Sequence, residues 1–160
     1  MSNLLESAQT FIVNNARLLE RQRLAYLLGS GSRQQVLAAL LGYQNPDGGF
    51  GNALEPDKRT STSQPIDQEL ALRVLDEIDG EFEVARRICD FLETITTDEG
   101  GVPFVLPTVR DAPRAEWWNT DSDAPPATIN PTAGIAGLLY KQGVEHRWLE
   151  RATAFCWRQI

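Results

Sequence analysis

Apolar residues recur along most of the chain at the three-to-four-residue spacing of an amphipathic α-helix. In the first such stretch, residues 3–28, the spacing is interrupted at Asn14 and Asn15, which predicts a kink or break there. Ser32 is placed to cap the second stretch. Strand-like alternation is confined to residues 102–109, where two prolines argue against a central strand. The pattern therefore predicts an all-α fold, with helices over residues 3–28, 33–43, 66–78, 82–95, 131–142 and 146–159.

Two long loops, residues 44–63 and 96–129, begin with related sequences. LLGYQNPDGGF starts at Leu40, and LETITTDEGGV starts at Leu92. Each passes from a helix end to an acid, two glycines and an apolar residue. This similarity indicates an internal repeat.

Two further matches extend the repeat into the helices. Residues 64–66 (Gln-Pro-Ile) correspond to residues 130–132 (Asn-Pro-Thr), and the segment ending at Cys89 corresponds to the one ending at Cys156. The repeated unit is a helical hairpin with a glycine-rich loop and a period in the fifties to sixties. Such units bury their apolar faces only by stacking on one another.

Composition narrows the function without identifying it. The length of 160 residues predicts a single domain over 1–160, and the net charge of −7 argues against nucleic acid as a partner. Cys89, Cys156 and the single histidine, His146, lack the spacing of a metal site, so we expect no metal and no cofactor. The start of the chain does not read as a signal peptide, and no apolar run is long enough to span a membrane. We expect a cytoplasmic protein.

The most specific segment runs from Gln44 to Phe50. Gly48 and Gly49 permit the positive φ of a tight turn, Asp47 can accept a hydrogen bond from the backbone that follows it, and Phe50 returns to the core. The segment resembles the Gln-x-x-Asp-Gly-x-aromatic (QW-type) repeat of the terpenoid cyclase and prenyltransferase β-subunit superfamily, which includes the squalene cyclases. Gln44, Asp47, Gly48 and Phe50 match that repeat.

The resemblance implies helical hairpins that form about half of an (α/α) toroid. Helices 66–78 and 131–142 would then be inner helices, and the outer helices would be 33–43, 82–95 and 146–159. The resemblance also implies a structural role for the Gln44–Phe50 motif, with catalysis by Asp47 as the minor alternative. The second copy of the motif is weaker, because Thr96 replaces the glutamine.

Asp121 and Asp123 are the candidate catalytic residues. Class II terpene cyclases protonate an alkene with an Asp-x-Asp-Asp motif. Asp121-Ser-Asp123 is the segment of this chain that matches the motif best, although it lacks the last aspartate. Paired carboxylates raise one another's pKa when they are buried. The alternative is a solvated acidic loop without chemistry.

Trp117, Trp118, Glu55 and Asp57 are the candidate substrate-binding residues. Adjacent tryptophans outside a helix can line a cavity, stabilise a cation or stack on a sugar; alternatively, they pack the loop over the end of the helices. Both long loops lead into inner helices. We therefore expect all four residues, with Asp121 and Asp123, to lie at the same end of the helices.

The first functional hypothesis is a terpenoid cyclase- or prenyltransferase-like protein that handles an isoprenoid. The second is a carbohydrate-active toroid enzyme, a polysaccharide lyase or glycosidase, and the third is a non-catalytic binding toroid. The sequence does not decide whether the chain is an enzyme. An incomplete ring would leave Phe155, Trp157 and Ile160 facing water, which predicts self-association or pairing with a missing second half.

Overall fold

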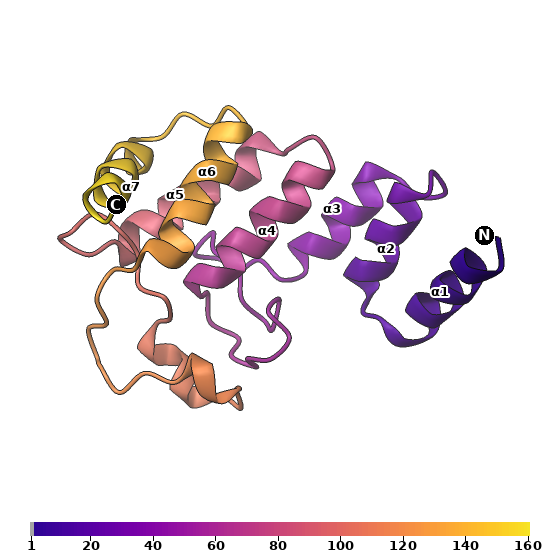
Figure 1. The fold of residues 1–160 in the computed structure, drawn as a ribbon, viewed down its shortest axis with the longest axis horizontal. Helices are drawn as coiled ribbons and strands as arrows, with labels where there is room; N and C mark the ends of the chain where they lie inside the picture. Colours follow the sequence, from indigo (N-terminus) through magenta and orange to yellow (C-terminus); the bar gives the residue numbers. More distant parts are fainter. Residues whose placement is uncertain (1) are drawn as a thin grey trace. The chain divides into compact units, whose positions relative to one another are not determined.

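The computed structural model describes residues 2–160 and is all-helical, as the sequence predicts (Figure 1). No strand forms among these residues, where β-type pairing is limited to isolated bridges. The α-helices are α1 (Ser2–Asn15), α2 (Leu18–Leu27), α3 (Arg33–Leu41), α4 (Pro65–Glu77), α5 (Phe82–Ile95), α6 (Ile129–Lys141) and α7 (Arg147–Arg158). Two short 3-10 helices, η1 (Pro107–Asp111) and η2 (Glu116–Trp118), lie in the second long loop.

The chain forms two compact units, and the first ends at Gly42. The break expected at Asn14 and Asn15 is confirmed, because α1 ends at Asn15 and α2 begins three residues later. The cap expected at Ser32 is confirmed as well: its hydroxyl accepts from the Gln35 backbone N–H, and the Gln35 side chain accepts from the Ser32 N–H at 2.8 Å. α2 packs against α3 in this unit.

The second unit, Tyr43–Ile160, consists of two stacked helical hairpins. α4 lies beside α6, and α5 lies beside α7, while each hairpin also packs its own two helices together (Figure 1). The core is formed by the apolar faces of these four helices; buried members include Leu72, Leu75, Ile88, Leu92, Ile135, Leu139, Trp148 and Phe155.

The two hairpins repeat the contacts of their Gly-Gly turns. Gly48 and Gly100 both have positive φ, and a Cβ built on either would come within 3.0 Å of a backbone oxygen, that of Arg87 on α5 or Arg151 on α7. Neither position therefore accommodates a side chain. The glycine that follows each of them packs against a phenylalanine ring of the same helix.

The repeat continues at the starts of α4 and α6. Gln68 accepts a hydrogen bond from the Phe50 N–H at 2.9 Å, and Thr132 accepts the equivalent bond from the Val102 N–H at 3.0 Å. The hydrogen bonds that close the α4–α5 and α6–α7 connections are also equivalent, from Gly80 to Leu75 and from Val144 to Leu139. Equivalent residues of the paired helices, α4 with α6 and α5 with α7, are therefore 64 positions apart.

This register corrects two details of the sequence repeat. The proline match implies a shift of 66 and the cysteine match a shift of 67, so that the structural counterpart of Cys89 is Thr153 and not Cys156. The prolines mislead because Asn130 has non-helical dihedral angles inside the first turn of α6. The glycines of the two turns, Gly48 and Gly100, are 52 positions apart, whereas equivalent helix residues after the loops are 64 apart. The second loop is therefore twelve residues longer than the first.

The structure also places Cys89, His146 and Phe155. Cys89 is fully buried, and burial raises the pKa of its thiol to about 12. His146 caps α7, where its Nδ1 accepts from the Trp148 N–H. Phe155 is 1% exposed against Gly101, so the expectation that it faces water is wrong.

Candidate functional site

The two long loops meet at the end of the second unit where α4 and α6 begin (Figure 1). The Arg59 N–H donates to the Pro113 carbonyl at 2.9 Å, and the Ala115 N–H donates to the Asp57 carbonyl at 2.8 Å. The prediction that both loops share one end of the helices is thereby confirmed. We call this region the loop end.

Gln64, the N-cap of α4, joins the second loop to that helix. Its side chain is fully buried; the Oε1 atom accepts from the Leu106 N–H at 2.9 Å, and the Nε2 atom donates to the Thr108 hydroxyl at 2.8 Å. A buried amide with both ends satisfied fixes the positions of the groups around it. The loop end is therefore attached rigidly to the start of α4.

The centre of the loop end is an ion pair between Lys58 and Asp67, both fully buried. One Asp67 oxygen binds the Lys58 ammonium, and the other accepts from the Glu55 N–H at 2.8 Å. Burial lowers the pKa of Lys58, and the Asp67 carboxylate is the largest influence that opposes this. Removing one member would leave the other charge buried without compensation, which is strongly destabilising.

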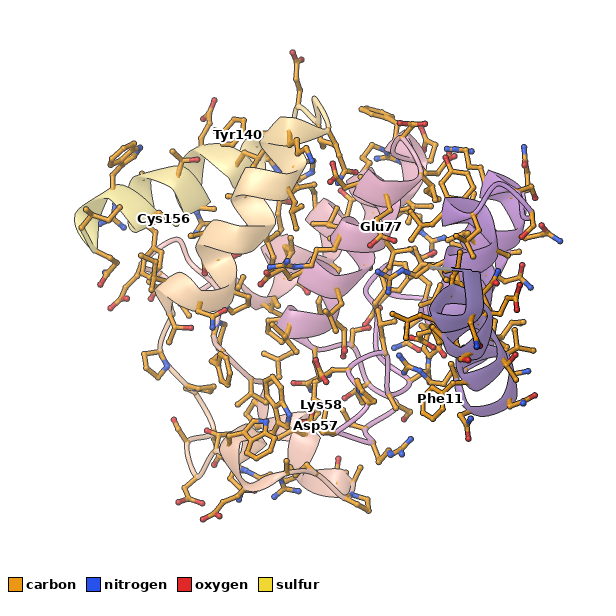
Figure 2. All side chains as sticks on the ribbon, turned by 45° about the vertical axis from the view of Figure 1, so that its right-hand side comes forward. Phe11, Asp57, Lys58, Glu77, Tyr140 and Cys156 are labelled. Atoms are coloured by element: carbon orange, nitrogen blue, oxygen red, sulfur yellow. The ribbon has the colours of Figure 1, made fainter. Side chains whose placement is uncertain are left out.

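Glu55 and Asp57 form a carboxylate pair on the same turn. Burial is the main cause that raises the pKa of Glu55, and the neighbouring Asp57 raises it further by charge and by a hydrogen bond; Lys58 opposes both. Glu55 therefore holds a proton to higher pH than an ordinary glutamate. Figure 2 labels Asp57 and Lys58 side by side at the loop end.

The two tryptophans have different environments. Trp118 is 5% exposed and stacks on Phe104, with ring centroids 5.0 Å apart. Its indole N–H donates to Asp57 Oδ1 at 2.5 Å, and its ring lies 5.7 Å from the Lys58 ammonium. Trp117 is 65% exposed and is therefore the ring that a ligand can reach.

Asp121 and Asp123 lie on an exposed part of the second loop. Asp123 pairs with Arg110 at 2.5 Å, and its side chain is 93% exposed. The same guanidinium donates to the carbonyls of Thr120 and Ser122, both at 2.7 Å, and so fixes the path of the loop. The burial that would couple the two carboxylates is absent. Their catalytic role stays a prediction.

The backbone just before Glu55 is strained. Asn52 and Ala53 both have left-handed dihedral angles, with φ of 54° and 60°. Asparagine tolerates this conformation, whereas alanine adopts it only at a cost of about 1–2 kcal/mol. Strain of this kind is concentrated at functional sites, so it adds to the case for the Glu55 turn.

The Gln44–Phe50 motif makes the contacts of a structural turn. Asp47 Oδ1 accepts from the Gly49 N–H at 2.9 Å and from the Ser63 hydroxyl at 2.8 Å. Gln44 donates to the Gly48 carbonyl at 3.0 Å, and Phe50 is fully buried. These side chains are occupied with holding the turn in shape.

Lys58 and Asp67 are not among the candidate site residues that the sequence predicts. A charged residue in a glycine- and proline-rich loop is typical of solvated surface. The one signal in the sequence that could have identified Lys58 is its position directly after Glu55-Pro56-Asp57. In the described part of the chain, no group of three histidine, cysteine or acidic side chains could hold a metal ion.

Comparisons with family models, with curated proteins and with solved structures find no match to this chain. None of the helices within residues 2–160 has both the length and the hydropathy to cross a membrane.

Proposed function

We propose that the chain forms part of an (α/α) toroid of the terpenoid cyclase and prenyltransferase type, and that its loop end binds and protonates a neutral isoprenoid. The toroid is supported by the two hairpins in one register, each with a Gly-Gly turn against its second helix. The function rests on one observation: the partly buried carboxyl of Glu55 lies beside Asp57, where burial and the neighbouring carboxylate raise its pKa.

The charge of the loop end favours a neutral ligand over a diphosphate. Three carboxylates, those of Glu55, Asp57 and Asp67, surround the single ammonium of Lys58. That ammonium is buried and already bonded to Asp67. A diphosphate would meet an excess of negative charge, whereas a hydrocarbon or an alcohol would not.

The two carboxylates of the pair have distinct roles in this proposal. The indole N–H of Trp118 donates a hydrogen bond to Asp57, while burial and Asp57 together raise the pKa of Glu55. Glu55 is then the proton donor. The exposed ring of Trp117 supplies a π face for a hydrocarbon or a developing cation.

The second candidate function is action on a carbohydrate. A glutamic acid with a raised pKa is the general acid that protonates a glycosidic oxygen. An exposed tryptophan ring such as that of Trp117 also stacks on a sugar. The same residues thus serve either substrate class, and ligand binding has to decide between them.

A fluorescence titration separates the candidates. We expect farnesol to change the fluorescence of the chain, farnesyl diphosphate to bind at least about tenfold more weakly, and an oligosaccharide panel to bind no better than the diphosphate. Trp117→Ala and Glu55→Gln should each weaken farnesol binding. Glu99→Gln, at the second Gly-Gly turn, is the matched control and should not.

Each other outcome decides against part of the proposal. Saturable binding of an oligosaccharide but not farnesol would establish the second candidate in place of the first. Tighter binding of the diphosphate would refute the charge argument. Binding of farnesol without any product detectable by mass spectrometry would indicate a non-catalytic binding toroid.

A further inference from the structure

The face that the first hairpin turns towards the second is acidic. Asp76 on α4 pairs with Lys141 on α6 at 2.6 Å. On the outer helices, Asp90 of α5 lies 3.3 Å from His146 at the start of α7. Two more acids on α4 and α5 also face the second hairpin: Glu93 pairs with Arg147, and the Glu69 carboxylate lies over Gly134, where a Cβ would meet it at 2.7 Å.

The same positions of the second hairpin are apolar. In the 64-residue register, the counterparts of these four acids are the residues of what we call the edge face: Ala133, Tyr140, Ala154 and Trp157. All four are exposed, with Trp157 at 72% and Tyr140 at 56%. Figure 2 labels Tyr140 on α6.

Two positions next to the edge face show that no further helices of the second unit pack on it, unlike the same surface of the first hairpin. Cys89 and Leu92 of α5 are fully buried. Their counterparts Thr153 and Cys156 on α7 are only partly buried. The edge face is thus the surface that in the first hairpin is covered by a further pair of helices.

We propose that the edge face is the contact through which two copies of this chain form a symmetric dimer. A further hairpin with the chemistry of α6 and α7 does not fit, because its lysine, histidine and arginine would meet Tyr140, Ala154 and Trp157 instead of acids. A two-fold contact needs a surface that complements itself, and a neutral apolar surface does so.

The net charge of the chain gives a second reason for a contact between copies at this face. Two copies that each carry −7 repel one another, and the contact that buries no like charges is the least opposed. The edge face has no acidic residue at the four positions where the first hairpin has one each. Tyrosine and tryptophan are also the residues most enriched among the dominant contributors to interface energy.

Sedimentation velocity of the full chain, over a wide range of concentrations, tests the proposal. Wild type should sediment as a dimer at high concentration and dissociate on dilution. Trp157→Glu should weaken the dimer at least about tenfold, and Ala154→Arg should do the same while leaving every aromatic ring in place.

Phe82→Glu is the matched control, because Phe82 is also an exposed aromatic residue, at 55%, but lies at the start of α5 and outside the edge face. It should leave the dimer intact, and circular dichroism should show that all three variants are folded. A wild-type chain that stays monomeric at every concentration would overturn the proposal. So would a dimer that survives both edge-face variants, or one that Phe82→Glu disrupts equally.

Discussion

The two hairpins of the second unit share one framework but differ in what their loops hold. In each, a Gly-Gly turn packs against the second helix of the hairpin, α5 or α7, and a polar side chain of the first helix, α4 or α6, binds the residue after the turn. The first loop adds a buried ion pair to this framework. The second hairpin has Pro131 at the position of Asp67 and so lacks any counterpart of that pair.

The second loop has a small core of its own in place of the ion pair. Val105, Val109 and Trp118 are buried together there, with Phe104 packed against them. A hydrogen bond from the Trp118 indole to Asp57 joins this core to the turn that carries Glu55. The difference indicates a division of roles, in which the longer loop supports the shorter loop that carries the carboxylate pair.

The largest expected effect is the loss of the buried charge pair. Lys58→Met should lower the free energy of unfolding by about 3–5 kcal/mol, because it leaves Asp67 buried and unneutralised. The double variant Lys58→Met/Asp67→Asn should recover most of this loss. Lys141→Met removes an exposed ion pair that joins the two hairpins and should cost less than about 1 kcal/mol. Urea unfolding measures all three, and equal losses for Lys58→Met and Lys141→Met would contradict the comparison.

The shared turn should respond equally in both hairpins. Gly48→Ala and Gly100→Ala should each cost about 1–3 kcal/mol, since both glycines have positive φ and no room for a Cβ. Gly143 also has positive φ but has open space around it, so Gly143→Ala should cost less. Thermal unfolding compares the three. A large cost at Gly48 with none at Gly100 would show that the hairpins are not equivalent.

Relief of the strain before Glu55 should stabilise the chain. Ala53→Gly should raise the free energy of unfolding by up to about 1 kcal/mol, because glycine adopts the left-handed conformation without the Cβ penalty. It should also weaken farnesol binding if the strain helps to place Glu55. A destabilised variant would mean that the alanine methyl group contributes more through packing than the strain costs.

A smaller effect is expected at the exposed acids of the second loop. Asp123→Ala should change the free energy of unfolding by less than about 1 kcal/mol, since its ion pair with Arg110 is open to water. It should leave farnesol binding unchanged. Loss of binding in this variant but not in Glu55→Gln would move the site to Asp121 and Asp123, the residues that the sequence favours.

The smallest effect is a pH dependence that comes from Glu55. Its pKa is higher in the folded chain than in the unfolded chain, where it is about 4.3. The stabilisation from this group is therefore complete below that value and is lost as the pH rises through the folded pKa. Urea unfolding on both sides of this interval should show the decrease in wild type and a smaller one in Glu55→Gln.

The helices and the repeat could be predicted from the sequence because both depend on local patterns. Apolar spacing placed six helical regions, and Ser32 and the two asparagines marked a cap and a break. The register of the repeat was missed by two or three residues. Matching prolines or cysteines is a weaker guide than the hydrogen bonds that Gln68 and Thr132 make.

The centre of the loop end could not be predicted, because it depends on the path of a loop. Lys58 and Asp67 are nine residues apart, and nothing in the pattern of residues between them indicates that the loop brings the ammonium under the start of α4. Trp118 was identified, but its partly buried partners, Phe104 and Asp57, come from segments that only the fold brings together.

The proton affinity of Glu55 is the most direct test of the account. Carbon-detected NMR of the side-chain carboxyls can follow Glu55 and Asp57 individually as the pH is changed. The account predicts that Glu55 titrates above the ordinary glutamate range of about 4.3, and that Asp57→Asn moves its pKa back towards that range. A Glu55 that titrates at or below the ordinary value, unaffected by Asp57→Asn, would contradict the proposed proton donor.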